Sequence, residues 1–460
     1  MVAGGEFKVT VSKTEVVAAV LPLQEHWLPL SNLDLLLPPV DVSVFFCFHK
    51  PSLQSMTFAS MVAILKKALA QTLVSYYALA GEVVLNPVGE PELLCNNRGV
   101  DFVEAFANVE LSELNLYNPD ESIQGKLVPN KKNGVLSIQA TELNCSGVVV
   151  ACTFDHRIAD AYSINMFLVS WAELAQSKPM SLLPSFRRSV LNPRRPGCID
   201  PALDDMYVPL SPSPSPKEPV GATHDDHLIS RIYYVTKDQL NELQSLASAN
   251  GCRRTKLESF SAFLWKMIAK CGATNSERTS KLGIVVDGRS RLSQGDSEKS
   301  RLMGAYFGNV LSIPIGGQKI IELEEKPLSF VANQVHAFLE NAVTQHHFLA
   351  LIDWVEAHRP QPALAKIYIN GTDDGPAFVV SSGQRFPVSR VDFGWGKPAF
   401  GSYHFPWGGD AGYVMPMPSP LGNGDWVVYL HLLKKQLQVI EREASNVFRP
   451  LTADYLNLMK

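Results

Sequence analysis

The sequence lacks the features that mark membrane-spanning, secreted and zinc-binding proteins. It has no run of 18 uninterrupted apolar residues, and residues 1–8 have neither the apolar core nor the cleavage site of a signal peptide. No two cysteines have CxxC spacing, and no pair of cysteines lies at ligand spacing near a histidine. We therefore expect reduced thiols, no metal site and a cytoplasmic protein. The scattered cysteines, odd in number, are Cys47, Cys95, Cys145, Cys152, Cys198, Cys252 and Cys271.

An excess of charge of one sign is also missing. The chain holds 41 Lys and Arg residues against 45 Asp and Glu residues, so its formal net charge is −4. Such a weak acidic balance exerts no long-range attraction on nucleic acids or on anionic lipids. We expect neither a nucleic acid nor a membrane as a partner, although a local basic pocket remains compatible with a phosphorylated ligand.

Length and composition predict a globular protein with two domains. Apolar residues make up 46% and charged residues 19% of the 460 residues, a balance far from that of disordered chains. The chain is longer than the roughly 250–300 residues at which single cores stop growing. Residues 191–224 are rich in proline and serine, and we interpret them as a linker between an N-terminal domain, residues 1–190, and a C-terminal domain, residues 225–460.

Both halves mix predicted strands with long helices, which indicates an α/β fold. Apolar side chains recur at helical spacing in residues 55–77 and 164–174, and Thr236 and Thr255 are suited to begin two further helices. Runs rich in apolar and β-branched residues predict the strands. These strands are residues 7–21, 42–48, 82–86, 92–95, 148–154, 228–235, 282–286, 366–370, 377–380 and 427–433.

His156 is a candidate catalytic residue because it follows a predicted buried strand and precedes a helix. Residues 148–154 are almost continuously apolar, and the end of such a strand places side chains at the rim of a rigid sheet. A neutral imidazole can accept a proton from a hydroxyl group and return one to a leaving group. Asp160 follows four residues later and, on a regular helix, would share a face with His156 and orient it. This spacing alone also fits surface or cap residues without a catalytic role.

A second motif far along the chain makes the first one specific. Residues 156–160 read His-Arg-Ile-Ala-Asp, and residues 392–396 read Asp-Phe-Gly-Trp-Gly. In order, separation and chain length they resemble the HxxxD and DFGWG motifs of the plant BAHD acyltransferases, and the resemblance covers essentially the whole chain. The N-terminal third, with residues 23–30, looks closest to the coniferyl-alcohol-acyltransferase-like branch, and piperine and piperamide synthases look similar. Further segments that fit the family are residues 79–81, 286–291 and 306–310.

The resemblance implies a fold of two chloramphenicol-acetyltransferase-like domains, with mixed sheets, flanking helices and an active-site channel between the domains. It implies that His156 is the general base, which deprotonates an acceptor that then attacks the thioester of an acyl-CoA. Acyl-CoA is a co-substrate, and no permanently bound cofactor, metal or covalent intermediate is implied. Asp160 is expected to point away from the channel and to pair with Arg289, a structural role that competes with the orienting role. Members of the family are usually monomers.

The resemblance also assigns residues to architecture and to coenzyme A binding. The DFGWG segment is expected to lie away from the histidine and to support the domain architecture and coenzyme A binding. Its residues are Asp392, Phe393, Gly394, Trp395 and Gly396. A basic segment at the start of a predicted helix is expected near the nucleotide end of coenzyme A, with a solvated charge cluster as the alternative. It consists of Arg253, Arg254, Thr255 and Lys256.

Ser381, Ser382 and Gly383 resemble a segment that lines the acceptor channel in the family. Hydroxycinnamoyltransferases often carry Thr-Ser-Trp there, so Gly383 stands at the position of a tryptophan. We expect this departure to enlarge or reshape the pocket and to disfavour a shikimate-type acceptor. Asn309 is a candidate polar contact to the reaction intermediate, with a turn residue at a strand end as the alternative.

The sequence thus predicts transfer of an acyl group from acyl-CoA to the hydroxyl or amine of a plant specialised metabolite, with phenylpropanoid alcohols first. One alternative is amide formation of the piperine and piperamide type, from an aromatic acyl-CoA and an amine such as piperidine. Another is an inactive family member that serves as a binding protein, although intact His156, Arg289 and Asn309 argue against it. A peptide-synthetase condensation domain is disfavoured, because those domains usually read HHxxxDG and this chain has Asp155 and Ala161.

Overall fold

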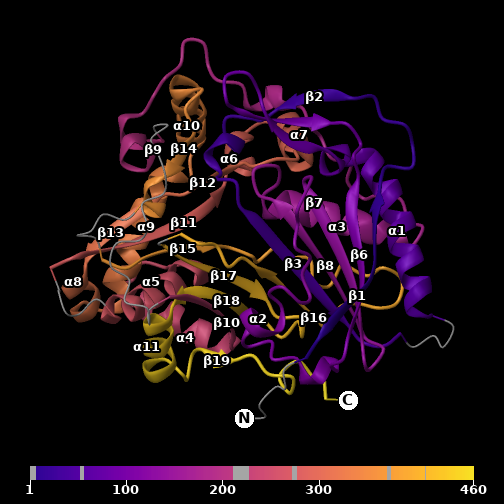
Figure 1. The fold of residues 1–460 in the computed structure, drawn as a ribbon. Helices are drawn as coiled ribbons and strands as arrows, with labels where there is room; N and C mark the ends of the chain where they lie inside the picture. Colours follow the sequence, from indigo (N-terminus) through magenta and orange to yellow (C-terminus); the bar gives the residue numbers. More distant parts are fainter. Residues whose placement is uncertain are drawn as a thin grey trace.

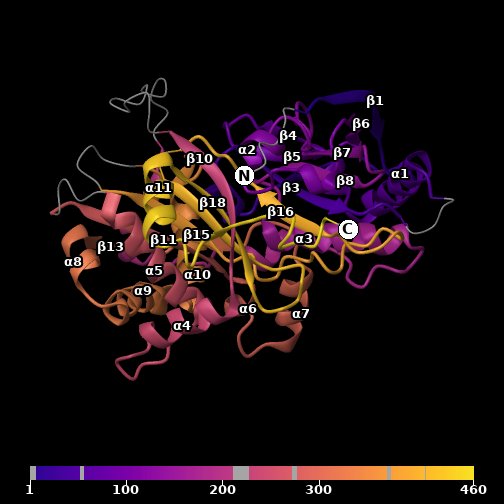
Figure 2. The same ribbon diagram turned by 90° about the horizontal axis from the view of Figure 1, so that it is seen from below.

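Two mixed β-sheets lie side by side, and helices pack on both of them (Figures 1 and 2). In Figure 1 the first half of the chain, indigo to magenta, lies on the right and the second half, orange to yellow, lies on the left. The computed structural model describes residues 7–51, 56–210, 227–271, 277–369, 375–409 and 411–459.

Six strands form the first sheet, in the order β1-β6-β7-β8-β3-β16. Neighbouring strands are antiparallel, except that β6 and β7 are parallel. Every residue of β8 is buried, as its continuous apolar sequence predicts. The strands are β1 (Val9–Val17), β3 (Asp41–Phe48), β6 (Val100–Ala107), β7 (Leu136–Leu143), β8 (Val148–Asp155) and β16 (Phe400–His404).

Helices α1 (Phe58–Ser75) and α3 (Ala161–Ala175) pack against each other and share the apolar core of the first sheet. The indole nitrogen of Trp171 donates a hydrogen bond of 3.0 Å to the carbonyl of Leu65, which fixes α3 on α1. Asp160 is the N-cap of α3, and it therefore ends the short turn that carries the candidate histidine.

The second sheet runs in the order β12-β11-β15-β17-β18-β10-β19, and β13 also pairs with β11. Strands β11, β15 and β17 are parallel, so the carboxyl ends of β11 and β15 lie at one edge. The strands are β10 (Leu228–Val235), β11 (Thr279–Asp287), β12 (Leu311–Ser312), β13 (Ile315–Lys319), β15 (Ala377–Ser381), β17 (Gly412–Pro418), β18 (Trp426–Leu433) and β19 (Arg449–Pro450).

Helix α5 lies at the centre of the helical layer on the second sheet, where it contacts α4, α8, α9 and α11. Thr236 caps α4, and Thr255 forms a capping box with Glu258 at the start of α5, as their sequence patterns predict. The helices are α4 (Lys237–Ala247), α5 (Lys256–Ala269), α8 (Ile320–Glu325), α9 (Leu328–Ala342) and α11 (Lys434–Glu443).

The remaining elements border the two sheets. A small sheet has the order β2-β5-β4, and β9 pairs with β14. The strands are β2 (His26–Pro29), β4 (Glu82–Leu85), β5 (Pro91–Cys95), β9 (Tyr207–Pro209) and β14 (Ala363–Ala365). The α-helices are α2 (Pro119–Ser122), α6 (Arg289–Leu292), α7 (Ser297–Ala305) and α10 (Gln345–His358). The 3-10 helices are η1 (Asp34–Leu36), η2 (Tyr77–Ala80), η3 (Leu111–Glu113), η4 (Arg188–Leu191), η5 (Pro201–Asp205) and η7 (Lys366–Tyr368).

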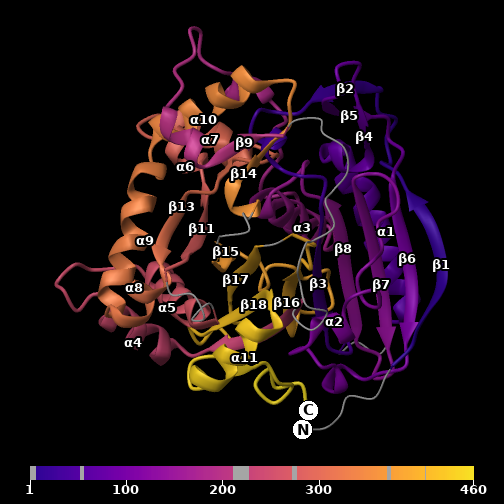
Figure 3. The ribbon, with the colours of Figure 1, turned by 60° about the vertical axis from the view of Figure 1, so that its left-hand side comes forward.

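One strand crosses from the second half of the chain into the first sheet. Strand β16 pairs with β3 in antiparallel register, with Phe400 opposite Cys47. It also contacts β18, so it lies where the two sheets meet (Figure 3). The two sheets therefore do not divide cleanly between residues 1–190 and 225–460, and these domain boundaries stay a prediction.

Two segments differ from what the sequence predicts or lie partly outside the described residues. The sequence predicts a strand over residues 366–370, but Lys366–Tyr368 form the 3-10 helix η7 after the short strand β14, so the prediction is wrong there. Residue 370 lies outside the described residues. The expected linker, residues 191–224, is ordered in its first part, where η5 and β9 form. The proline-rich remainder, from residue 211, lies outside the described residues.

The DFGWG segment packs on the first half of the molecule. The Phe393 ring is fully buried, with its centroid 4.7 Å from that of Trp171 and 6.0 Å from that of Phe48. Asp392 accepts hydrogen bonds from the backbone of Gly394 (2.8 Å) and Gly396 (3.0 Å). Both glycines have positive φ angles, 109° and 114°, which other residues adopt only with strain. The motif is thus a tight turn anchored by a buried ring.

We predict that Phe393→Ala destabilises the protein by about 3–5 kcal/mol, because it empties a fully buried aromatic site. Chemical denaturation measures the change. Phe106→Ala is the matched control, since Phe106 lies in β6 of the first sheet and its side chain is 41% exposed. Equal losses of stability for both variants would contradict the anchoring role.

Candidate active site

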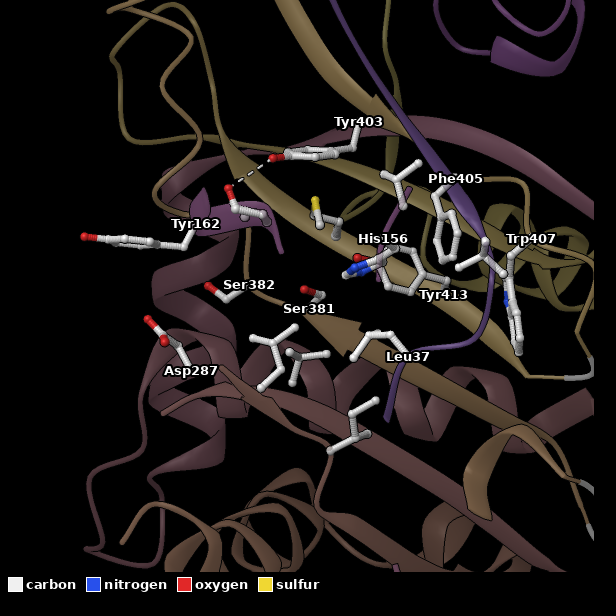
Figure 4. A pocket seen from close by; sticks show the side chains of 18 of the residues that line it. Leu37, His156, Tyr162, Asp287, Ser381, Ser382, Tyr403, Phe405, Trp407 and Tyr413 are labelled. Carbon is white, nitrogen blue, oxygen red and sulfur yellow. Dashed lines mark hydrogen bonds between the residues drawn. The ribbon is translucent and has the colours of Figure 1, made fainter. Parts of the chain in front are cut away.

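A cavity of about 310 Å³ lies where the two sheets meet. His156 and Val42 reach it from the first sheet, and Asp287 and Ser381 reach it from the carboxyl ends of β11 and β15 in the second. Figure 4 shows the His156 side chain in the middle of this cavity, between side chains from both halves. Residues far apart in sequence thus surround one imidazole.

Backbone contacts hold His156 at the cavity wall. Its backbone nitrogen donates a hydrogen bond of 2.9 Å to the carbonyl of Val40, which continues the pairing of β8 with β3. The imidazole lies between the rings of Phe154 and Phe405, each with its centroid 6.4 Å away. Nδ1 is buried and has no hydrogen-bond partner among the described residues.

Asp160 and Arg289 form a buried ion pair next to the histidine turn. The two guanidinium nitrogens lie 2.7 and 3.1 Å from the two carboxylate oxygens, and the side chains are 1% and 5% exposed. Burial lowers the pKa of Arg289, but attraction to Asp160 and Asp287 outweighs this and raises it above the ordinary value. The Asp160 carboxylate also accepts hydrogen bonds from the backbone of Ser163 and Val310.

The prediction that Asp160 orients the ring of His156 is therefore wrong. Both oxygens of Asp160 are engaged by Arg289 and by backbone N–H groups, and neither forms a hydrogen bond with the ring of His156. The prediction assumed that His156 and Asp160 lie on one helix. Asp160 is instead the N-cap of α3 and has extended backbone angles, so the two side chains do not share a helix face. The pair joins α3 of the first half to α6 of the second.

Asn309 supports the backbone of the histidine, and the prediction that it contacts the intermediate needs correction. It is fully buried and does not belong to the cavity wall. Its amide nitrogen donates to the carbonyls of His156 (2.9 Å) and Arg157 (3.1 Å) and to the carboxylate of Asp34 (2.9 Å). Asp34 also accepts from the Asn309 backbone and lies 3.8 Å from Arg188. Asn309 thus contacts the backbone of the histidine turn and does not reach the cavity.

Ser381, Ser382 and Gly383 line the cavity. A Cβ atom at Gly383 would lie 2.6 Å from Cγ of Met417 and 2.9 Å from Cγ of Met415. Methionine side chains therefore occupy the direction that a tryptophan ring would take. The departure from the family pattern thus changes the wall, where Met415 and Met417 pack against Gly383.

The basic segment at the start of α5 lies outside the cavity wall. Arg254 donates hydrogen bonds of 2.7 and 3.1 Å to the side chain of Asn333 on α9, while Arg253 is exposed. Thr255 and Glu258 satisfy each other in the capping box. Lys256 is half-buried. A contact between this segment and coenzyme A stays a prediction.

Sequence patterns missed an aromatic wall that begins next to His156. The Phe405 centroid lies 5.1 Å from that of Tyr413 and 6.4 Å from that of Trp407, and Tyr368 lies 4.6 Å from Trp407. These residues follow β16, begin β17 or form η7, so no single periodic segment contains them. Only the tertiary fold brings them together.

Comparison with known proteins assigns the family. A model of the Transferase family matches residues 7–447. The chain belongs to this family, the BAHD acyltransferases. It is an acyl-CoA-dependent acyltransferase, as the two motifs predicted.

Individual relatives of this BAHD acyltransferase are similar over most of their length. Omega-hydroxypalmitate O-feruloyl transferase of Arabidopsis thaliana is 29% identical over 383 residues, which cover 80% of this chain and 78% of that protein. Shikimate O-hydroxycinnamoyltransferase of Nicotiana tabacum is 27% identical and covers 95% of this chain and 99% of its own length. The crystal structure of vinorine synthase superposes with a TM-score of 0.72 at 19% identity, with 96% and 99% coverage. The predicted two-domain fold is confirmed.

We predict that Asp160→Ala destabilises this BAHD acyltransferase by about 3–5 kcal/mol, because it leaves Arg289 buried without its main partner. Thermal or denaturant unfolding measures the loss. Glu277→Ala removes an exposed ion pair with Lys319 and should cost less than about 1 kcal/mol. Comparable losses in the two variants would contradict the importance of the buried pair.

We predict that Asn309→Ala lowers kcat by about 10–100-fold with little change in KM, because the histidine backbone loses its support. Steady-state kinetics on the folded fraction measures both constants. Asp353→Asn is the control. Asp353 is also buried, and its carboxylate pairs with Arg194 and does not contact the turn of His156. A fall in kcat of similar size in the control would show that general loosening, and not positioning, is responsible.

Proposed function

We propose that the protein transfers an acyl group from an acyl-CoA to the hydroxyl of a phenylpropanoid-type alcohol, with His156 as the general base. The observation that carries this proposal is the position of the imidazole in the middle of a cavity to which both halves contribute. A base in this position can reach a donor and an acceptor that occupy opposite sides of it. The family assignment supplies the acyl-CoA-dependent reaction type.

In the proposed reaction, His156 takes the proton of the acceptor hydroxyl as its oxygen attacks the thioester carbonyl. The resulting tetrahedral intermediate collapses, the carbon–sulfur bond breaks, and the thiolate takes the proton back from His156. The products are the ester and free coenzyme A, so atoms and charge balance without a further reactant. Holding the two substrates and the base in one cavity supplies the proximity that such a transfer needs.

The cavity wall supports an apolar, ring-bearing acceptor or acyl group. Phe405, Trp407 and Tyr413 offer ring surfaces beside the base, and Leu37 faces them in Figure 4. Aromatic side chains bind planar rings through stacked and edge-on contacts. An amine acceptor would follow the same steps and give an amide, so product analysis must separate ester from amide.

We predict that His156→Ala lowers turnover by about 10²–10⁴-fold, the usual contribution of general-base catalysis. A panel of acyl-CoAs with alcohols and amines is incubated with the enzyme, thiol release is followed, and products are identified by mass. His26→Ala, a histidine outside this cavity, is the control and should retain activity. Unchanged turnover in His156→Ala would show that another group acts as the base. Thiol release with no acceptor requirement would contradict acyl transfer.

A further inference from the structure

The two ends of the cavity differ in chemistry, with His156 between them. Figure 4 shows Tyr162, Ser382 and Asp287 on one side of the imidazole, and Phe405, Trp407 and other apolar groups on the opposite side. We name these the polar end and the aromatic end. The difference restricts which charged groups a bound acceptor can carry.

The aromatic end offers ring faces and few free polar atoms. The indole nitrogen of Trp407 already donates a hydrogen bond of 2.9 Å to the carbonyl of Ala411. The hydroxyl of Tyr413 interacts with Ser381, and burial raises the pKa of this tyrosine to about 12, so it stays neutral. Leu37 adds aliphatic surface. An anion placed here would lose its hydration without a compensating charge.

Each cation of the cavity wall has a carboxylate beside it. Among the described residues, three Asp, Glu, Lys or Arg side chains line the cavity, namely Asp287, Arg289 and Arg385. Arg289 is buried and binds Asp160, Asp287 and the carbonyl of Gly308. Arg385 is 74% exposed at the polar end, where its nitrogen lies 3.5 Å from the carboxylate of Asp287. The same carboxylate thus faces both arginines.

We propose that the enzyme takes a neutral, ring-bearing acceptor and rejects acceptors that carry a carboxylate, an inference that rests on the proposed function above. At the aromatic end its carboxylate would have no cation, and at the polar end it would have to displace Asp287 from Arg385, the exposed cation there. A buried carboxylate without a partner costs several kcal/mol, enough to decide between two otherwise equal substrates.

Three acceptors with one common nucleophile test the proposal. They are benzyl alcohol, 4-(hydroxymethyl)benzoate and its methyl ester, and the methyl ester separates the effect of charge from that of size. With an acyl-CoA that the enzyme uses, we expect kcat/KM for the acid to lie roughly 100-fold or more below that for its ester. Equal values for acid and ester would overturn the proposal while leaving acyl transfer intact.

Binding measurements keep the two proposals distinguishable if none of the three compounds is acylated. Quenching of tryptophan fluorescence reports occupation of the aromatic end, and Trp407→Phe gives the baseline. Tighter binding of the ester than of the acid supports the neutral-acceptor inference even if the proposed transfer fails. Binding of the acid as tight as that of the ester contradicts the inference.

The variant Asp287→Asn tests the physical cause. It keeps the oxygen that accepts from the backbone of Arg289 but removes the charge that holds Arg385. We expect the ratio of acid to ester in kcat/KM to rise about tenfold, because Arg385 becomes free to pair with the acid. Adding Arg385→Ala should abolish this gain. An unchanged ratio in Asp287→Asn would show that Asp287 does not exclude carboxylates.

Discussion

The buried ion pair between Asp160 and Arg289 is the contact on which the site depends. It joins the N-cap residue of α3 in the first half to the first residue of α6 in the second half. Since both side chains are almost completely buried, neither charge can be hydrated if the other is lost. The turn that carries His156 is therefore fixed by an attraction between the two halves, in addition to local hydrogen bonds such as the one from the backbone of Arg157 to Asp155.

A second contact, from the side chain of Asn309, fixes the backbone of the same turn. Asn309 donates to the carbonyls of His156 and Arg157, and the buried carboxylate of Asp34 holds the amide of Asn309 in place. A side chain between two such contacts loses little freedom when substrates bind, because its backbone is already ordered. The cavity around it is lined by side chains from strands of both sheets, from α3 and from the loops that follow β15 and β16.

Periodicity and capping residues in the sequence predicted individual strands and helices well. Strand β10 spans the predicted residues 228–235, and Thr236 and Thr255 begin helices because their hydroxyls accept backbone hydrogen bonds. Pairings between distant segments could not be predicted in this way. The insertion of β16 beside β3 depends on tertiary packing, and no periodicity of residues 400–404 indicates which sheet they join.

For the same reason, only those features of the site that depend on neighbouring residues in the sequence could be predicted. His156 could be identified because a buried strand and two motifs point to it, whereas the direction of the Asn309 side chain depends on Asp34, which lies 275 residues away in sequence. Gly383 marks a departure from the family pattern, but only the structure shows that Met415 and Met417 fill the space. The aromatic wall is invisible in sequence because its members belong to separate elements.

A crystal structure of the enzyme with a non-hydrolysable acyl-CoA analogue and a neutral acceptor tests the central claim most directly. The account predicts that the donor carbonyl carbon and the acceptor oxygen meet beside His156, about 3–3.5 Å apart, with the acceptor oxygen within hydrogen-bonding distance of the imidazole. A complex in which the reacting atoms meet elsewhere, with the imidazole in contact with neither substrate, would contradict it.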